Sequence, residues 1–295
     1  MNDRKLNLII GWICFLISFI VYYLTAEPTV GFWDTGEYIT TSAKLQVGHP
    51  PGAPLYQMLG AIFSIFAFEK ENIGFIMNLM SGFTSALAIS FMYWSIILIL
   101  KKITDTSEAS INKQILISGS ALVGSLAFAF TDTFWFSAVE TEVYAMATLI
   151  MAVIFYLGLR WEADMHNSRG DKWLLLICFV IGLSFGVHFM GLLVIPAIVM
   201  IYYFKNQKTI LNSTKVNPII GFFIANIIGL GILMGVFKLL LPNTLKFFSA
   251  IELLFVNNLG LPFNSGTLAA FIVIVYAFYF LLNFTRKKGM VRANT

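Results

Sequence analysis

The stretch that decides the fold class is LNLIIGWICFLISFIVYYLT, which runs from Leu6 to Thr25 without a charged side chain. An α-helix needs about 20 apolar residues to cross a hydrocarbon core about 30 Å thick. Similar runs recur along the chain, of which 58% is hydrophobic and only 12% charged. They lack the alternation of a membrane β-barrel, and backbone that faces lipid must satisfy its own hydrogen bonds. The sequence therefore predicts an all-α, polytopic bundle of membrane helices.

About eight spans are expected, all within a single membrane domain, residues 1–295. Loops rich in Lys and Arg alternate with acidic loops, and basic loops concentrate on the cytoplasmic side of membranes. We therefore place the acidic loops 26–52 and 131–142 outside and both termini in the cytoplasm. The expected spans lie near 6–25, 73–100, 115–130, 143–159, 173–187, 188–204, 218–241 and 268–284.

Two apolar segments are assigned by this alternation of loops. Segment 53–68 must stay on the outer face, so the first outer loop, 26–72, is expected to be helical and to lie on or dip into the membrane. Segment 173–204 must cross twice, since a single helix of that length would extend about 48 Å. The turn within it places His188 at or just beneath the outer face.

The charge and the cysteines exclude several classes of protein. The net charge of +4 comes from basic clusters between apolar runs, which membrane orientation explains without a nucleic-acid partner. The first run is too long for a signal peptide and lacks a cleavage site, so we expect an uncleaved anchor. Cys14 and Cys178 lie inside apolar runs and imply neither a disulfide nor a metal site.

The polar residues of the first outer loop gather in GFWDTGEYITTSAKLQVGHPPGAPLY, residues 31–56. Asp34 and Glu37 would share a helix face with Thr41. The same spacing is a capping box, with Asp34 at the N-cap and Glu37 at the third helical position, and on spacing alone this plain helix start is favoured. Two prolines after His49 fix the local backbone and hold this side chain in a defined place.

The pattern D-x-G-E followed by G-H-P-P-G-x-P-L-Y resembles the first outer loop of GT-C superfamily integral membrane glycosyltransferases. The similar branch contains the transmembrane protein O-mannosyltransferase-like proteins of animals and long membrane proteins of Bacteroidota. Such proteins continue for hundreds of residues, so the resemblance implies the N-terminal part of a longer GT-C architecture. Further matching segments are MNLMSGFTSALA from Met77, FWFSAVETEVYAM from Phe134, GLSFGVHFMG from Gly182 and FVNNLGLPFNSGT from Phe255.

The resemblance implies transfer of a sugar from a polyprenyl-phosphate-linked donor to a hydroxyl acceptor, expected to be a protein Ser or Thr. The phosphate is already a leaving group, whereas the acceptor hydroxyl needs a base. By resemblance Asp34 is the candidate base and Glu37 orients it or the sugar. His49 and His188 are the favoured partners of the phosphate, Lys44 belongs to the same pool of cations, and Glu142 and Tyr144 form a wall of the site.

Neither a metal nor a cofactor is implied beyond the lipid-linked donor itself. Expected partners are membrane lipid and a protein or glycan acceptor, with no nucleic acid. The expected location is the bacterial inner membrane, with the active face extracytoplasmic. A lipid-carrier transporter or flippase would need charges near the membrane midplane, and the spans carry few. A non-catalytic scaffold, in which the acidic motif is only a helix cap, is the other alternative.

Overall fold

The computed structural model describes residues 3–104, 111–167 and 170–287, and these form helices, turns and loops with no strand among them. The prediction of an all-α polytopic membrane protein is therefore confirmed. Contacts divide the chain into two compact units, which are described separately. Unit 1 comprises Met1–Ala163 and Leu176–Val194, and unit 2 comprises Asp164–Leu175 and Ile195–Thr295. The single membrane domain expected from the sequence stays a prediction.

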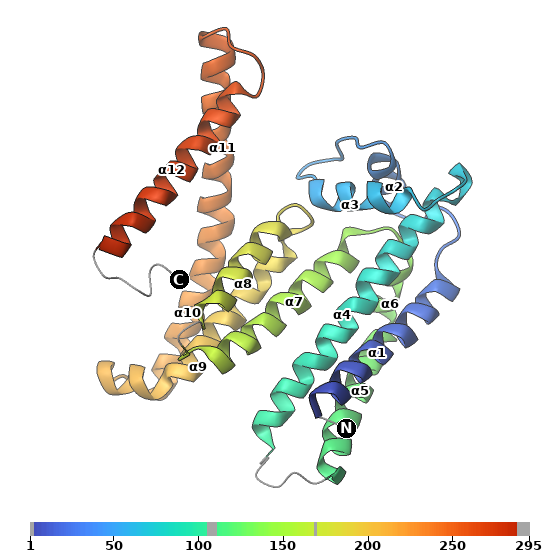
Figure 1. Cartoon of the computed structure of the whole chain (residues 1–295), viewed down its shortest axis with the longest axis vertical. Coiled ribbons are helices and arrows are strands. Elements are labelled where there is room, and N and C mark those ends of the chain that lie inside the picture. The colour runs from blue at the N-terminus through green and yellow to red at the C-terminus, as the bar shows by residue number, and fades with distance from the viewer. Residues whose placement is uncertain (1–2, 105–110, 168–169, 288–295) are drawn as a thin grey trace. The chain divides into compact units, whose positions relative to one another are not determined.

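Unit 1 is built on a pair of long helices, α1 (Asp3–Thr25) and α4 (Ile73–Ile103), which lie side by side (Figure 1). The buried face of α1 repeats every three or four residues and is made largely of small and polar side chains, which lets helix backbones approach closely. Ser90 of α4 donates its hydroxyl to the carbonyl of Gly11 at 2.8 Å. The buried residues of α1 are Asn7, Gly11, Cys14, Ser18 and Tyr22.

Helix α5 (Ile111–Ala129) packs against both α1 and α4 and is followed at once by the short helix α6 (Asp132–Val139). The axes of α5 and α6 differ by 66°. Two contacts fix the bend to the end of α1: the Tyr22 hydroxyl donates to the carbonyl of Ala129 at 2.8 Å, and Trp135 Nε1 donates to Thr25 Oγ1 at 2.9 Å. Helix α7 (Val143–Asp164) follows, so the acidic loop lies between the anchored α6 and this long helix.

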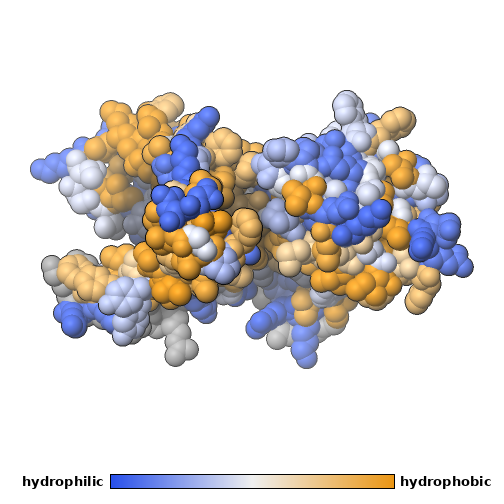
Figure 2. Space-filling model, turned by 90° about the horizontal axis from the view of Figure 1, so that it is seen from above, coloured by the Kyte–Doolittle hydropathy of each residue, from blue (hydrophilic) through white to orange (hydrophobic). Residues whose placement is uncertain are grey.

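Residues 26–72, expected to be the first outer loop, contain short helices at one end of the α1–α4 pair: α2 (Thr35–Ala43), α3 (Pro54–Ser64) and η1 (Lys70–Asn72) (Figure 1). With eleven residues, α3 is about 16 Å long and too short to cross a membrane. Seen from above, hydrophilic residues at this end are interrupted by hydrophobic ones (Figure 2). Trp33 and Phe68, which are 88% and 97% exposed, suit a position at a membrane interface.

Unit 2 contains α9 (Ile195–Thr214) packed against α10 (Pro218–Gly235), and α11 (Leu241–Leu253) packed against α12 (Ser265–Lys287). A wider π-helical turn, η3 (Val236–Leu240), joins α10 to α11, and a second one, η4 (Leu254–Asn258), extends α11, so that Pro218–Asn258 is one continuous helix. Glu252 accepts hydrogen bonds from the backbone N–H groups of Asn264 and Thr267. These bonds fix the start of α12 to α11.

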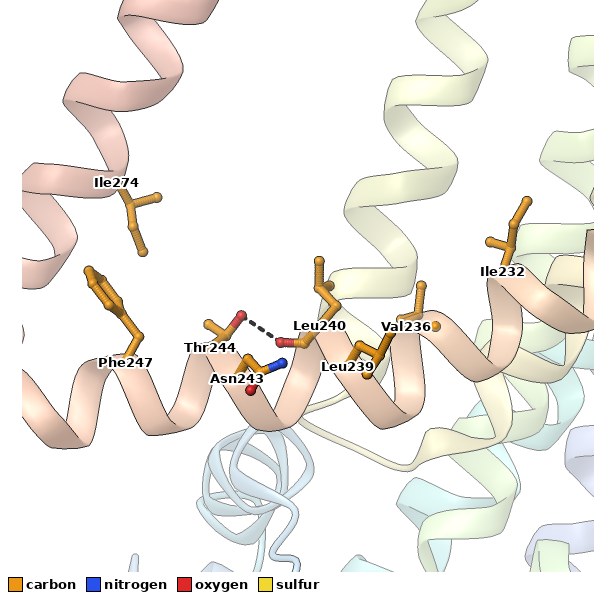
Figure 3. A pocket seen from close by; sticks show the side chains of 9 residues that line it. Ile232, Val236, Leu239, Leu240, Asn243, Thr244, Phe247 and Ile274 are labelled. Carbon is orange, nitrogen blue, oxygen red and sulfur yellow. Dashed lines mark hydrogen bonds between the residues drawn. The ribbon is translucent and has the colours of Figure 1, made fainter.

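A groove of about 630 Å³ runs between this continuous helix and α12. Phe247 and Ile274 face each other across it, and the Thr244 hydroxyl donates to the Leu240 carbonyl at 2.8 Å (Figure 3). Asn243 and Thr244 are the polar side chains in an otherwise apolar lining. Such a surface suits contact with apolar side chains or lipid tails.

Remaining parts of the chain are α8 (Asp171–Ser184) and η2 (Phe189–Val194), which continues into α9. Within the described ranges, six helices are long and apolar enough to cross a membrane, or seven if the bent pair α5–α6 is one span. Helix α8 has fourteen residues, fewer than the 17 or so that a span requires. The expected count of eight spans and their orientation stay predictions.

Candidate functional site

Asp34 stands immediately before α2, and its side chain makes no capping hydrogen bond to the helix. Glu37 does not turn back to the helix start either. Its carboxylate accepts hydrogen bonds from the backbone N–H of His49 at 2.6 Å and from His49 Nδ1 at 3.1 Å. These bonds lower the pKa of Glu37, with the backbone N–H as the largest cause. The acidic pair therefore does not form the capping box that its spacing favours.

His49 is held between the two carboxylates. Its Nε2 lies 3.9 Å from Asp34 Oδ2, while its Nδ1 must donate to Glu37, because a carboxylate only accepts. The peptide bond between Pro50 and Pro51 is cis, and the N–H of Gly52 donates to the His49 carbonyl at 2.8 Å. Gly52 has φ of +82°, a conformation that favours glycine. The turn thus positions the imidazole ring over the start of α2.

A second pair of carboxylates comes from the loop between α6 and α7. Glu140 and Glu142 are 6% and 8% exposed. Burial is the main reason that the pKa of Glu142 rises to about 7, and the nearby charge of Asp34 adds to it. Burial also raises the pKa of Glu140, whose side chain lies against Gly31 so closely that a Cβ there would come within 2.7 Å of the Glu140 carboxyl carbon.

Asn78 of α4 anchors both loops that carry these acids. It is fully buried, and its amide donates to the carbonyls of Glu27 at 2.7 Å and Thr29 at 2.9 Å. Its amide oxygen accepts from the Thr141 hydroxyl, next to Glu142. Sequence reasoning missed this residue, although an Asn inside an apolar helix is the signal that could have found it. The Glu27 N–H also donates to the Val139 carbonyl at 3.0 Å, which joins the two loops directly.

His188 lies in the turn between α8 and η2. Its ring packs edge-on against Tyr144, with ring centres 5.4 Å apart. The N–H of Met190 donates to His188 Nδ1 at 3.2 Å, so the proton of the neutral ring lies on Nε2. His188 can therefore donate a hydrogen bond without first becoming charged.

These side chains line two cavities, both within unit 1. The smaller cavity, about 100 Å³, is lined by both histidines and by Tyr38. The larger cavity, about 620 Å³, is lined by Glu140, by hydroxyl groups and by aromatic side chains such as Phe136. The residues shared by both linings are Asp34, Glu142 and Tyr144. We call these three residues the shared wall.

The structure brings together most of the residues named from the sequence. The shared wall and the two histidines line the smaller cavity. Glu37 is connected to these residues by its hydrogen bond with His49. Lys44 is exposed at the C-terminal end of α2 and is absent from the linings described for both cavities. Its expected contact with the donor phosphate stays a prediction.

A divalent cation could be held by one atom each from Asp34, Glu37 and His49, since these atoms lie within 4.8 Å of one another. Carboxylate oxygen and imidazole nitrogen are ordinary metal ligands. The Glu37–Nδ1 contact also leaves Nε2 of neutral His49 with a lone pair, as in many metal-ligating histidines. The sequence implies no metal and leaves metal dependence open, and this geometry makes it a matter for experiment.

Comparison with known proteins adds to this geometry. Residues 34–211, more than half of the chain, match the family model described as protein O-mannosyl-transferase TMEM260 N-terminal domain. The protein O-mannosyl-transferase tmem260 of Dictyostelium discoideum is 24% identical over 210 residues, 67% of this chain and 24% of that protein. The mouse protein O-mannosyl-transferase TMEM260 is 27% identical over 167 residues, 56% of this chain and 21% of that protein. The chain thus spans under a quarter of each relative within these alignments. No solved structure matches it.

Proposed function

Because the chain belongs to the family of the protein O-mannosyl-transferase TMEM260 N-terminal domain, we propose that it carries the catalytic loop of a membrane O-mannosyltransferase of the GT-C type. The donor is a polyprenyl-phosphate-linked mannose and the acceptor is a Ser or Thr hydroxyl on the extracytoplasmic face. One observation carries the proposal: Asp34, the first residue of the family match, lies in the wall shared by two cavities, and only the smaller of these is also lined by histidines.

The smaller cavity is the better place for the donor phosphate. His188 can donate from Nε2 while neutral, and His49 can do so once its ring is protonated. Asp34 and Glu142 line both cavities, but the larger one adds Glu140 and has no Lys, Arg or His among its described lining residues. With no basic side chain to offset these acids, the larger cavity is less suited to a phosphate than to an uncharged sugar or acceptor hydroxyl.

The proposed reaction follows from placing the phosphate in the smaller cavity and the sugar and acceptor in the larger one. The acceptor hydroxyl gives its proton to the Asp34 carboxylate while its oxygen forms a bond to the anomeric carbon of mannose. The bond between that carbon and the phosphate oxygen breaks, and the phosphate leaves with the electron pair. The histidines stabilise the negative charge on the departing phosphate. Glu37 keeps His49 in place for this role through two hydrogen bonds.

Glu142 is a second candidate for the base. Its pKa of about 7 places it among carboxyl groups suited to accept a proton near neutral pH. While protonated, it can instead donate a hydrogen bond to the sugar. Asp34, with its side chain 55% exposed, is the more accessible of the two and stays our first assignment.

The test is transfer of mannose from a polyprenyl-phosphate donor to a Ser- or Thr-containing peptide by the purified chain in lipid nanodiscs. Asp34→Asn should abolish transfer while the melting temperature stays near that of the unmodified chain. Asp132→Asn is the matched control, because Asp132 is an exposed acid between two residues that line the larger cavity. Unchanged transfer by Asp34→Asn would contradict the assignment of the base. No transfer by the unmodified chain would contradict the proposed activity, leaving the transporter and scaffold alternatives.

A further inference from the structure

A third cavity of unit 1 lies near the first residues of α1, at the opposite end of that helix from Asp34. Helix α1 has 23 residues and so separates the two ends by about 35 Å. The cavity measures about 450 Å³ and is lined by residues of α1, α4 and α7. It shares no lining residue with the two cavities around Asp34.

The floor of this cavity is a fixed polar network. Asp3 forms an ion pair with Lys101 and accepts a hydrogen bond from the Asn7 amide at 3.1 Å. The Asn7 side chain is buried and accepts from the hydroxyls of Tyr93 at 3.2 Å and Ser118 at 3.0 Å. Three helices are therefore joined at this end, and the groups above the floor are held in place.

Positive charge exceeds negative charge in the lining. Arg4, Lys101 and Arg160 are its cations, and Asp3 is its only acid among the lining residues described. Counted over the described lining residues, the formal charge is therefore +2.

Three aromatic rings form the apolar wall together with Leu8, Ile97 and Leu98. The Phe91 and Trp94 ring centres lie 5.2 Å apart, and Tyr156 of α7 lies 5.5 Å from Phe91 and 6.3 Å from Trp94. Trp94 Nε1 donates to the backbone carbonyl of Asn7 at 3.2 Å, which holds the indole beside the polar floor. A basic rim is therefore continuous with an apolar wall along membrane-spanning helices.

We propose that this cavity binds an anionic phospholipid. The lipid phosphate contacts Arg4 and Arg160 at the rim, and the upper part of an acyl chain lies along Phe91, Trp94 and Tyr156. Basic pockets between membrane helices are a recurrent mode of binding for such headgroups. A free phosphate would use only the rim, whereas the volume and the aromatic wall match an amphipathic ligand.

The experiment titrates the purified, delipidated chain in detergent with phosphatidylglycerol, phosphatidylcholine or inorganic phosphate, and counts bound lipid by native mass spectrometry. Phosphatidylglycerol should bind more tightly than phosphatidylcholine. The double variant Arg4→Gln, Arg160→Gln should weaken phosphatidylglycerol binding by about fivefold for each arginine removed. The matched control is Lys113→Gln, Lys208→Gln, which removes the same charge outside the cavity and should leave binding unchanged.

Three results would overturn the proposal: equal affinity for the two lipids, equal losses in the arginine and lysine variants, or binding of inorganic phosphate with the same dependence on the arginines. The single variant Arg160→Gln keeps the pairings of the first turn of α1 and serves if the double variant unfolds. It should still lose about fivefold. Because binding is measured directly, the result does not depend on the mannosyltransferase assay.

Discussion

Glu37 accepts hydrogen bonds from both the backbone N–H and the ring Nδ1 of His49, twelve residues further along the chain. This contact links the start of α2 to the turn that precedes α3. It gives the acidic motif a use that a helix cap would not have, because the Glu37 carboxylate orients a ring in the lining of the smaller cavity.

Replacement of Glu37 should therefore impair transfer more than folding. Glu37→Ala removes both acceptors and should lower kcat/KM for the donor about a hundredfold, the cost of a misplaced catalytic group. Glu37→Gln keeps an oxygen for the His49 N–H and should lose only about tenfold. Steady-state kinetics with varied donor measures both, and Glu71→Gln, an exposed acid of η1, is the control. An unchanged kcat/KM in both Glu37 variants would show that the bonds to His49 do not matter.

The raised pKa of Glu142 predicts a pH-dependent stability. Its pKa rises from 4.5 to about 7, so between these values the folded chain holds a proton that the unfolded chain has lost. Stability should fall as pH rises from about 4.5 to 7 and then level off, by about 3 kcal/mol in total. Melting temperatures in detergent across this range test the slope, which Glu142→Gln should flatten. A slope unchanged in Glu142→Gln would assign it to other groups.

Asn78 should prove to be a positioning residue for both loops. Asn78→Leu leaves the carbonyls of Glu27 and Thr29 and the hydroxyl of Thr141 without their partner, and should destabilise the chain by about 3 kcal/mol. Transfer should fall as well, because the loop of Glu142 loses its anchor. A double-mutant cycle with Thr141→Val isolates the bond between the two side chains. Purely additive effects would show that this bond carries no coupling.

The close contact of α1 with α4 predicts a strict size limit at Gly11. A Cβ at this position would lie 2.1 Å from Trp94 Nε1, so Gly11→Ala must displace the indole. We expect a loss of about 1–3 kcal/mol, as for other overpacked contacts. Gly119→Ala on α5 is the matched control, since no atom lies within 4 Å of its added Cβ. Thermal unfolding in detergent compares the two, and equal behaviour would contradict the packing described.

Metal dependence distinguishes two roles for Asp34, Glu37 and His49: a base with its supporting residues, or the ligands of a cation. If Asp34 works as a base without a metal, EDTA should leave the rate of transfer unchanged, and added Mn²⁺ should not raise it. Loss of activity in EDTA with recovery on adding Mn²⁺ would instead assign Asp34, Glu37 and His49 to a cation. Asp132→Asn, measured in parallel, controls for weak binding of metal to exposed acids.

The long apolar runs made the helical membrane fold predictable, because few structures other than helices satisfy a backbone in lipid. Periodicity could not show where a helix ends inside an apolar stretch. Pro218–Asn258 therefore proves continuous at 41 residues, about 61 Å, where the sequence suggested a span that ends near 241. Pro242 lies in the first turn of α11 and does not interrupt the continuous helix.

Some residues of the site could be predicted from the sequence, but their contacts could not. The D-x-G-E and His-Pro-Pro patterns located Asp34 and His49, yet the partner of Glu37 depends on a contact across twelve residues that no local spacing reveals. The burial that raises the pKa of Glu142 comes from packing of separate helices. The role of Asn78 could not be predicted from its partners, because most of them are backbone carbonyls, which no sequence pattern marks.

The shared wall also has a consequence for engineering. Substitution of Asp34, Glu142 or Tyr144 changes both linings at once, so neither ligand preference can be tuned independently through them. Ser137 and Phe136 belong to the larger lining alone, and Phe189 to the smaller one. Libraries built at these outlying positions should therefore change the ligand preference of one cavity at a time, with Asp34 left untouched.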